Sequence, residues 1–282
     1  MNTLAIDIGG TKFGMAVFED KRMIRGESYE TDRARGREWM LERIESIGRQ
    51  WKSELPLDRC GIGFGGPVLF DRQRVALSTH VGGWSDFPLT EHIARALDLP
   101  AIMDNDANAG ALGEASHGAG GSADPLFYMT LSTGIGGGLV TRGSVYRGAD
   151  SYAGEIGHTT IDPNGPECLC GARGCYERMC CGLWLERDYG KPAKELLQDP
   201  EFTSHYVVRL AAGLKTVLML LNPARIVVGG GMSKAGDALF VPLRAELGRQ
   251  MTSWSHARID IQPAGLGDDS VLYGALELAK TI

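Results

Sequence analysis

The chain has 282 residues, of which 43% are hydrophobic and 23% are charged, an ordinary globular composition that excludes a disordered protein. Its formal net charge of −6 argues against a protein that binds nucleic-acid backbones, because such domains usually carry a basic face. The length predicts two domains rather than one, and no apolar run approaches the ~18 residues that a membrane span needs.

The first elements predicted are two strands joined by a tight glycine turn. In the segment TLAIDIGGTKFGMAVFED, Leu4, Ile6 and Ile8 alternate with smaller or polar residues, and β-type residues resume at Phe13. A third short strand is predicted within residues 22–31, RMIRGESYET. The chain therefore begins with three short strands in succession.

A helix is predicted over residues 37–51, because four apolar residues recur there at the spacing of one helical face. These residues are Met40, Ile44, Ile47 and Trp51. The next segment, RCGIGFGGPVLF, predicts a strand and a glycine turn. It contains a G-x-G-x-x-G pattern, but Pro67 and Val68 follow the last glycine and predict extended backbone, not the helix that a dinucleotide-binding loop needs. No G-x-x-x-x-G-K-[ST] pattern is present, which excludes the P-loop class.

The rest of the chain alternates between strands and helices. A helix at residues 91–100 is expected to end at Pro100, and residues 101–118 predict a short strand that runs into a helix. The Gly/Ser-rich stretch at 118–125 is the predicted domain boundary. The later elements predicted are a strand, glycine turn and strand from residue 126, a long helix at 204–221, a buried strand at 224–233 and a terminal helix at 268–282.

Each half of the chain contains a similar unit of strand, glycine/threonine turn and strand, DIGGTKFGMAVF and LSTGIGGGLVT. A turn such as Gly9–Lys12 presents consecutive N–H groups, a hydroxyl and an ammonium to an oxyanion, and Asp7 just before it is suited to hold Mg²⁺ through water. An ordinary β-hairpin would explain the first turn alone. A second turn at Thr133–Gly136 and a third at Gly229–Gly231 favour phosphate binding, with two similar halves facing one ligand.

Six segments occur in the order found in one protein family: DIGGTK, DNDANAGALGE, STGIGGG, GEIGH, CLCGARGCYE and VVGGGMS. Through them the chain resembles the ROK family of sugar kinases and regulators from about residue 4 to residue 275. The resemblance implies the actin-like ATPase (ribonuclease H-like) fold, with two α/β domains flanking a nucleotide and sugar cleft. The implied domains are a smaller one at 1–117 plus 269–282, onto which the terminal helix returns, and a larger one at 118–268.

The same resemblance implies ATP and Mg²⁺ as phosphoryl donor and a hexose or N-acetylhexosamine as acceptor, usually at its 6-hydroxyl. Asp106 matches the family's catalytic aspartate and would be the general base. An Asp just before a helix is also a favoured N-cap, and a helix N-terminus would lower its pKa. Asp104 is expected to be a cap or a solvated residue.

The remaining site residues follow from the same match. Those implied to contact the sugar are Gly66, His80, Asn105, Asp106, Glu155, His158 and Glu177. Those implied to bind the nucleotide are Asp7, Gly9, Gly10, Thr11, Lys12, Thr133, Gly134, Gly230 and Gly231.

Two positions depart from the family pattern. The loop Gly65-Gly66-Pro67 stands where the family commonly has Pro-Gly, and His80 stands where many relatives carry a sugar-contacting Asn. Imidazole is larger than the Asn side chain and can titrate, so we expect the pocket to fit a different sugar or a different anomer. The sequence leaves open which hexose or N-acetylhexosamine is the acceptor.

A metal site is predicted in the segment GHTTIDPNGPECLCGARGCYE, residues 157–177. The four ligands implied are His158, Cys168, Cys170 and Cys175, and three thiolates with one imidazole select Zn²⁺ over Mg²⁺ or Ca²⁺. Four protein ligands close a tetrahedral site, so we expect the metal to be structural, with the second imidazole nitrogen aimed at a sugar hydroxyl and Glu177 held by the same clamp. Reduced core cysteines are the alternative, and that is the expectation for Cys60, Cys180 and Cys181.

Other classes of protein remain as alternatives. A non-catalytic sugar-sensing regulator would carry a helix-turn-helix ahead of the first phosphate loop, yet that loop begins at residue 7 and Asp106 is retained. An ATPase module of the actin or chaperone kind would have no use for the sugar and zinc residues together, whereas a kinase with an atypical acceptor would. The clustered cysteines and an N-terminus without a basic signal region predict a cytoplasmic protein. The family implies a homodimer with neither a nucleic-acid nor a membrane partner.

Overall fold

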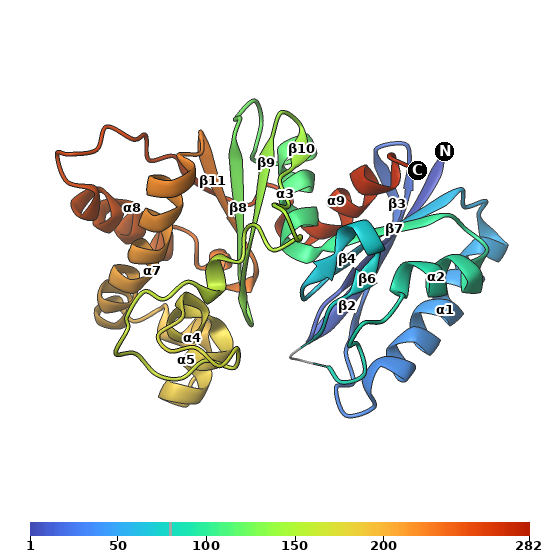
Figure 1. The fold of residues 1–282 in the computed structure, drawn as a ribbon, viewed down its shortest axis with the longest axis horizontal. Coiled ribbons are helices and arrows are strands. Elements are labelled where there is room, and N and C mark those ends of the chain that lie inside the picture. Colours follow the sequence, from blue (N-terminus) through green and yellow to red (C-terminus); the bar gives the residue numbers. More distant parts are fainter. Residues whose placement is uncertain (79–80) are drawn as a thin grey trace.

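The computed structural model describes residues 1–78 and 81–282, so the predicted sugar contact at His80 lies outside the described residues. Two five-stranded sheets form the framework, with strand orders β3-β2-β1-β4-β7 and β10-β9-β8-β11-β12 (Figure 1). The first sheet consists of β1 (Asn2–Ile8), β2 (Lys12–Glu19), β3 (Arg22–Glu30), β4 (Arg59–Phe64) and β7 (Ala101–Asn105). The second consists of β8 (Leu126–Leu131), β9 (Ile135–Thr141), β10 (Ser144–Val145), β11 (Arg225–Gly229) and β12 (Ile261–Pro263).

The two sheets have the same topology. In each, the first strand in the chain pairs antiparallel with the second and the second with the third, while the remaining pairs are parallel. The repeated glycine/threonine turn joins the first two strands of both sheets, β1 to β2 and β8 to β9. The structure thus confirms the prediction of two similar halves, which the weak identity between the two units could only suggest.

Helices cover the outer faces of both sheets, and two further helices lie between the sheets (Figure 1). The first half carries α1 (Gly36–Glu54) and α2 (Leu89–Leu97), and a two-stranded sheet of β5 (Val68–Leu69) and β6 (Arg74–Val75). The second half carries α4 (Tyr176–Cys180), α5 (Gly182–Tyr189), α6 (Ala193–Leu196), α7 (Pro200–Leu221) and α8 (Asp237–Met251). The central pair is α3 (Asp106–His117) and α9 (Ser270–Ala279).

The close approach of α3 and α9 depends on glycine. A Cβ at Gly113 of α3 would lie 2.1 Å from the carbonyl oxygen of Ser270, and one at Gly274 of α9 would lie 1.7 Å from that of Ala109. Real side chains do not fit at such distances, so these two positions require glycine for the helices to cross backbone to backbone. Some of the 39 glycines of the chain therefore serve helix packing and not turns.

The C-terminal helix returns to the first half of the chain. Residues of α9 pack against β1 and β2 in one buried cluster made of Ala5, Ala16, Phe18, Leu272, Ala275 and Leu276. Both chain ends consequently lie in the same half of the molecule (Figure 1). We retain the division into 1–117 plus 269–282 and 118–268 as a proposal.

Two helices begin or end at other residues than the sequence predicts. The helix expected from residue 204 begins at Pro200, because Asp199 caps it by accepting hydrogen bonds from the backbone N–H groups of Glu201 and Phe202. The helix expected to run to Pro100 ends at Leu97, because Asp98 takes a left-handed conformation with φ of 49°. By length and composition alone α7 could cross a membrane, but nine of its residues are buried in the protein core, and a core helix passes the same test.

Candidate active site

The first glycine turn connects the ends of β1 and β2. It is closed by a hydrogen bond of 3.0 Å from the backbone N–H of Gly9 to the carbonyl oxygen of Lys12. Asp7, the last but one residue of β1, has its pKa raised to about 7, chiefly by burial and further by the nearby carboxylate of Asp106, while Lys12 opposes the rise. The turn and the predicted catalytic aspartate therefore lie in one electrostatic environment.

The two repeated turns face each other across the cleft between the halves. The hydroxyl oxygens of Thr11 and Thr133 are 3.4 Å apart, although 122 positions separate the two residues. A cavity of about 890 Å³ opens beside them. It is lined by Thr11, Arg33, Ser132, Thr133, Gly182, Leu183, Glu186, Ala193, Lys194, Leu197, Gln198, Gly231, Met232, Lys234, Ala235 and Ala238. All three predicted phosphate turns thus contribute to, or adjoin, one cavity large enough for a nucleotide.

Two lysines from opposite halves share one carboxylate near this cavity. The ammonium of Lys234, which lines the cavity, lies 2.8 Å from Oδ2 of Asp268, and that of Lys12 lies 3.3 Å from the same oxygen. The lysines lower the pKa of Asp268. Arg33, also on the cavity wall, donates a hydrogen bond of 2.6 Å to the carbonyl oxygen of Gly10 in the first turn. The first turn is consequently surrounded by cationic side chains, as an anion site requires.

Asp106 is the first residue of α3, and it does not cap that helix. The N-cap is Asn105, whose Oδ1 accepts hydrogen bonds from the N–H groups of Ala107 and Asn108. The alternative interpretation of Asp106 as the helix cap is therefore wrong, and so is the expectation that the helix N-terminus would lower its pKa. Burial raises the pKa of Asp106 to about 7, and the carboxylate of Glu155 contributes, so both effects outweigh the hydrogen bond from Ala107.

The glycine loop after β4 lies against this carboxylate. A Cβ at Gly65 would sit 3.6 Å from Oδ2 of Asp106 and 3.1 Å from the carbonyl oxygen of Ile8. Asn105 fastens the loop by donating a hydrogen bond of 3.0 Å from Nδ2 to the carbonyl oxygen of Gly66. The structure therefore brings Gly66, Asn105 and Asp106 together at the ends of two neighbouring strands, β4 and β7.

The environment of Asp104 also differs from the one expected. Asp104 was predicted to be a cap or a solvated residue, but it is 1% exposed and forms an ion pair with Arg147 at 2.8 Å. Its other oxygen accepts hydrogen bonds from the backbone N–H of Asn105 and the side-chain amide of Asn108. Burial raises the pKa of Asp104 while the guanidinium of Arg147 opposes that rise. This pair could not be predicted from the sequence, because Arg147 is distant from Asp104 in the chain and belongs to no motif.

The three remaining predicted sugar residues come from the second half. Burial raises the pKa of Glu155, the charge of His158 opposes that rise and the carboxylate of Glu177 adds to it. The two segments are in contact, because a Cβ at Gly157 would lie 3.4 Å from the Cβ of Glu177. Glu177, in α4, also has a role that was not predicted: its Oε2 accepts a hydrogen bond of 2.8 Å from the backbone N–H of Ile135. It thereby supports the second glycine turn. His158 is exposed at the end of a short 3-10 helix that begins at Ile156.

The four predicted metal ligands form one cluster. The ligand atoms of His158, Cys168, Cys170 and Cys175 all lie within 4.8 Å of one another. The sulfurs of Cys170 and Cys175 are 3.6 Å apart, close to the roughly 3.8 Å expected across a zinc tetrahedron with Zn–S bonds of ~2.3 Å. The donor set and its spacing fit a zinc ion. The remaining cysteines, Cys60, Cys180 and Cys181, are buried in the core as predicted.

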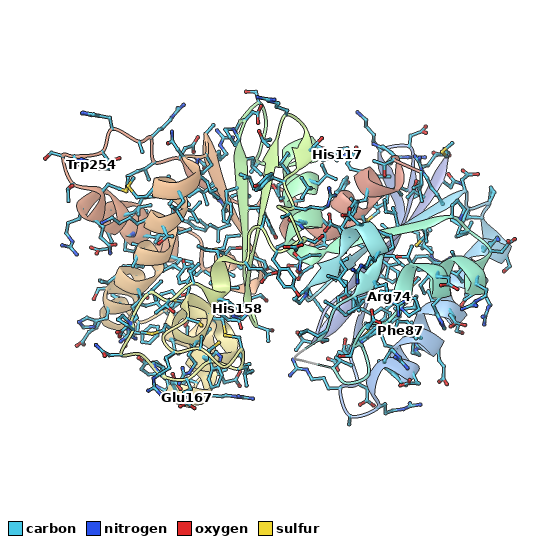
Figure 2. The ribbon with its side chains drawn as sticks, in the orientation of Figure 1. Arg74, Phe87, His117, His158, Glu167 and Trp254 are labelled. Atoms are coloured by element: carbon cyan, nitrogen blue, oxygen red, sulfur yellow. The ribbon has the colours of Figure 1, made fainter. Side chains whose placement is uncertain are left out.

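Backbone contacts shape the loop that carries the cysteines. The N–H of Gly171 bonds to the carbonyl oxygen of Cys168, and the N–H of Cys168 bonds to that of Ala172, which closes a tight turn between the first two thiols. Gly174, with φ of +62°, approaches so closely that a Cβ would lie 1.6 Å from the carbonyl oxygen of Asp162. In Figure 2, His158 lies in the same lobe as this loop, where the chain passes toward α4.

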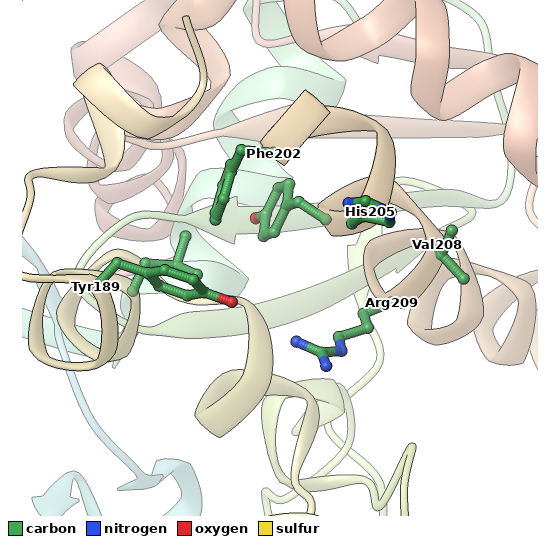
Figure 3. A pocket seen from close by; sticks show the side chains of 7 residues that line it. Tyr189, Phe202, His205, Val208 and Arg209 are labelled. Atoms are coloured by element: carbon green, nitrogen blue, oxygen red, sulfur yellow. The ribbon is translucent and has the colours of Figure 1, made fainter. Parts of the chain in front are cut away.

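A second cavity of about 440 Å³ lies on the second half between α5 and α7 (Figure 3). Leu185, Tyr189, Phe202, His205, Tyr206, Val208 and Arg209 line it. None of the predicted site residues is among them, whereas Thr11, Thr133 and Gly231 line the larger cavity, which makes the larger cavity the candidate nucleotide site.

Comparison with known proteins gives a consistent picture. Residues 3–282 match the sequence model of the ROK family. The chain is 31% identical to a glucokinase of Thermotoga maritima over an alignment 312 positions long, which covers 99% of this chain and 98% of the relative. It is also 30% identical to a xylose repressor of Bacillus subtilis over 232 residues, 78% of this chain and 60% of that protein. The crystal structure of a Streptomyces griseus ROK-family glucokinase in complex with glucose and AMPPNP superposes with a TM-score of 0.88 at 28% identity and covers all of both chains.

Proposed function

The chain belongs to the ROK family, has the actin-like ATPase fold and is an ATP-dependent sugar kinase, and on that premise we propose that it phosphorylates a hexose or N-acetylhexosamine with Asp106 as general base. The proposal extends to the 6-hydroxyl as the site of transfer. The observation that carries it is the position of Gly65, where an added Cβ would lie 3.5 Å from the Cα of Gly9 in the first glycine turn and 3.6 Å from Oδ2 of Asp106. The carboxylate of Glu155 supports it, because it is close enough to Asp106 to raise the pKa of that residue. Glucose is the first acceptor to test, because it is the sugar in the structurally similar complex.

The proposed reaction uses positioning and charge more than covalent chemistry by the protein. The sugar lies against the loop at Gly66 and between Asn105 and Glu155, with the hydroxyl to be phosphorylated facing Asp106. As the oxygen bonds to the γ-phosphorus, Asp106 accepts the hydroxyl proton and the bond between that phosphorus and the bridging oxygen of ADP breaks. A carboxylate whose pKa is about 7 is a stronger base than an ordinary aspartate and is still ionised in part at neutral pH.

Donor binding is proposed for the larger cavity. The turns at Gly9–Lys12, Thr133–Gly134 and Gly230–Gly231 would hold the phosphates through N–H groups, hydroxyls and Lys12. Asp7 would hold Mg²⁺ through water, where the ion supplies charge neutralisation between the phosphates. The close pairing of Thr11 with Thr133 supports this arrangement, since the phosphates must bridge both halves.

A structural zinc ion at His158, Cys168, Cys170 and Cys175 is part of the proposal. Its support is the clustering of the four ligand atoms within 4.8 Å. Bound there, the ion would fix the ring of His158 and the start of α4, and with it Glu177. The expected assembly is a homodimer, which sedimentation at micromolar concentration would test.

Turnover is expected to rise with pH through about 7, because Asp106 accepts a proton only when it is ionised and its pKa is raised to about 7. The ionised fraction is about a tenth one pH unit below the pKa and about nine tenths one unit above it, so kcat/KM should rise about tenfold over that range. The measurement is kcat/KM for the sugar against pH with saturating MgATP, which keeps Asp7 ionised by its bound cation.

The matched variant for the pH profile is Glu155→Gln. It removes a negative charge that raises the pKa of Asp106, so the midpoint of the rise should move to lower pH even if the sugar KM also increases. A flat profile, or a midpoint unmoved by this substitution, would contradict the assignment of the titrating group.

Lys234→Met is expected to raise KM for MgATP about tenfold, the loss of one charge-assisted contact to phosphate, with little change in KM for the sugar. The reason is that Lys234 lines the cavity proposed for the nucleotide, where it and Lys12 both contact the carboxylate of Asp268. Lys280→Met, which removes a lysine bonded to Glu277 at the end of the terminal helix, is the control and should leave both constants unchanged. A change confined to the sugar KM would count against the donor assignment.

A sugar sensor without catalysis is the second candidate, because the chain is also similar to a xylose repressor. That function predicts that sugars raise the melting temperature of the protein while none stimulates ADP release. The two functions are separated by a single panel of sugars measured both ways.

A further inference from the structure

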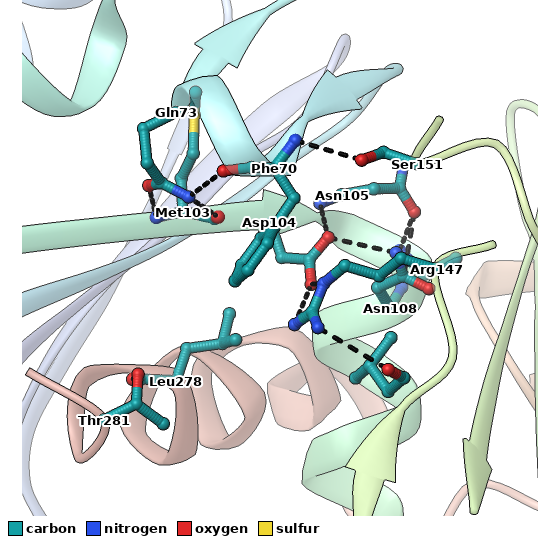
Figure 4. A network of polar contacts seen from close by, with 12 residues as sticks. Phe70, Gln73, Met103, Asp104, Asn105, Asn108, Arg147, Ser151, Leu278 and Thr281 are labelled. Carbon is teal, nitrogen blue, oxygen red and sulfur yellow. Dashed lines mark hydrogen bonds and ion pairs between the residues drawn. The ribbon is translucent and has the colours of Figure 1, made fainter. Parts of the chain in front are cut away.

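An ion pair between Asp104 and Arg147 joins the two halves of the molecule at the end of β7, two residues before Asp106. Nε and Nη2 of Arg147 each lie 2.8 Å from Oδ2 of Asp104 (Figure 4). The Asp104 side chain is 2% exposed and that of Arg147 is 22% exposed. Asp104 belongs to β7 of the first sheet, whereas Arg147 follows β10 of the second.

Arg147 is fastened to the first half at a second point. Its guanidinium carbon lies 3.5 Å from the ring centroid of Phe70, a cation–π geometry. Four residues further along the same segment, the hydroxyl of Ser151 accepts a hydrogen bond of 3.2 Å from the backbone N–H of Phe70 (Figure 4). The segment from 147 to 151 is therefore held against the first half, and it leads directly to Glu155.

The other oxygen of Asp104 controls the residues on either side of Asp106. Its Oδ1 accepts hydrogen bonds of 2.8 Å from the backbone N–H of Asn105 and of 3.0 Å from Nδ2 of Asn108 (Figure 4). One carboxylate thus fixes the residue before Asp106 and the residue one half-turn after it, while its second oxygen holds the segment that leads to Glu155.

A buried ion pair is a poor source of net stability, because two charges must be taken out of water to make it. A pair of apolar side chains could fill the same space at similar or lower cost. What apolar residues could not supply is the directional link from one carboxylate to four donors on two halves of the protein. Geometry is therefore the better explanation for a charge at residue 104.

We propose that Asp104 and Arg147 are positioning residues for the reaction: they fix the sugar-contacting segment that ends at Glu155 relative to Asn105 and Asp106. This inference rests on the proposed function. Neither residue touches the reacting atoms. Their effect is on the distance and orientation between the base and the sugar hydroxyl, and misplacement of about 1 Å at a reacting centre can cost about a hundredfold in rate.

The test is steady-state kinetics of Arg147→Gln. We expect kcat/KM for the sugar to fall about a hundredfold, with contributions from both constants, and KM for MgATP to change less than about twofold. The MgATP constant is spared because neither residue lines the nucleotide cavity. Arg147→Lys keeps the charge but loses the planar two-nitrogen contact, so it should recover part of the activity.

Arg225→Gln is the matched control. Arg225 also forms a two-nitrogen ion pair, with Asp260, at 3.0 Å and 3.1 Å, and the arginine has a comparable exposure of 30%. This pair joins the first residue of β11 to the residue before β12, and neither residue lines the nucleotide cavity. The control substitution should lower the melting temperature about as much as Arg147→Gln without changing the sugar constants. If Arg147→Gln does not fold, Phe70→Leu removes the ring beneath the guanidinium and should give a smaller loss of the same kind.

The outcomes separate this inference from the proposed function. Unchanged sugar constants in Arg147→Gln, or equal losses for sugar and MgATP, would overturn the positioning role. A wild-type protein without sugar-dependent ADP release would contradict the proposed function instead. Calorimetric titration of the sugar in the absence of ATP would then still decide on the pair, since its loss is expected to weaken sugar affinity and an unaltered affinity would refute it.

Discussion

Replacement of Asp106 by Asn is expected to lower kcat by about a thousandfold or more, while the sugar affinity stays within a few-fold of the wild-type value. The substitution keeps the shape of the side chain and the helix start, because the helix cap is Asn105 and not Asp106. It removes the group that accepts the hydroxyl proton. The measurement is sugar-dependent ADP release in a coupled assay, with sugar binding followed separately by calorimetry.

The matched control for this variant is Asp268→Asn, which removes another carboxylate of the cleft that does not face the sugar loop. It should alter KM for MgATP and leave proton transfer intact. Turnover by Asp106→Asn at more than about a tenth of the wild-type rate would contradict the assignment of Asp106 as general base, because a general base raises the rate by at least about a hundredfold.

Replacement of Cys170 by Ser is expected to release the zinc ion and to weaken sugar binding by about tenfold or more, with a smaller effect on ATP binding. The reason is that the cluster fixes His158 and the start of α4, from which Glu177 extends toward the second glycine turn. Metal content, sugar affinity and affinity for a non-hydrolysable ATP analogue are the three measurements.

Cys181→Ala is the control for the zinc variant. Cys181 lies in the same part of the chain but is buried in the core, outside the ligand cluster. Its replacement should lower the melting temperature somewhat and leave the zinc content unchanged. Equal losses of sugar and nucleotide affinity in Cys170→Ser would mean that the metal supports the whole fold. Retention of a full equivalent of zinc would refute the ligand set.

The sequence predicts most of the fold because its strongest signals are local. The alternation of Leu4, Ile6 and Ile8 yields β1, and the apolar stripe from Met40 to Trp51 yields α1. By contrast α8 was not predicted, since Pro242 interrupts its helical pattern after one and a half turns and its charged residues hide the apolar face. The crossing of α3 and α9 was not predicted either, because a glycine that permits helix contact has the same letter as one that makes a turn.

In the candidate site too, the residues that belong to local motifs could be predicted from the sequence, and the roles that depend on tertiary contacts could not. Motif residues such as Asp106 and Cys170 were identified because their spacing along the chain is itself the signal. Within DNDANA, however, sequence could not tell which residue caps the helix, which is buried and which faces the cleft. The structure shows that Asn105 caps the helix, that Asp104 is buried and that Asp106 lies against the glycine loop at Gly65. The ion-pair partner of Asp104 is Arg147, 43 positions further along the chain.

The pKa of Asp106 shows why local reasoning fails at this point. A helix N-terminus favours the ionised carboxylate and lowers the pKa, and that effect is visible from sequence. Burial between the two halves and the approach of Glu155 raise it, and both arise only when segments distant in the chain are brought together. The net rise to about 7 is therefore a property of the tertiary fold.

The most direct test of the central claim is sugar-dependent ADP release from MgATP across a panel of hexoses and N-acetylhexosamines, with the phosphorylated product identified by phosphorus NMR. If the chain is a kinase with Asp106 as general base, at least one sugar stimulates ADP release, the product carries the phosphate on its 6-hydroxyl, and Asp106→Asn abolishes the signal. If no sugar stimulates release while one or more raise the melting temperature, the chain is a sugar sensor and the proposed catalysis is wrong.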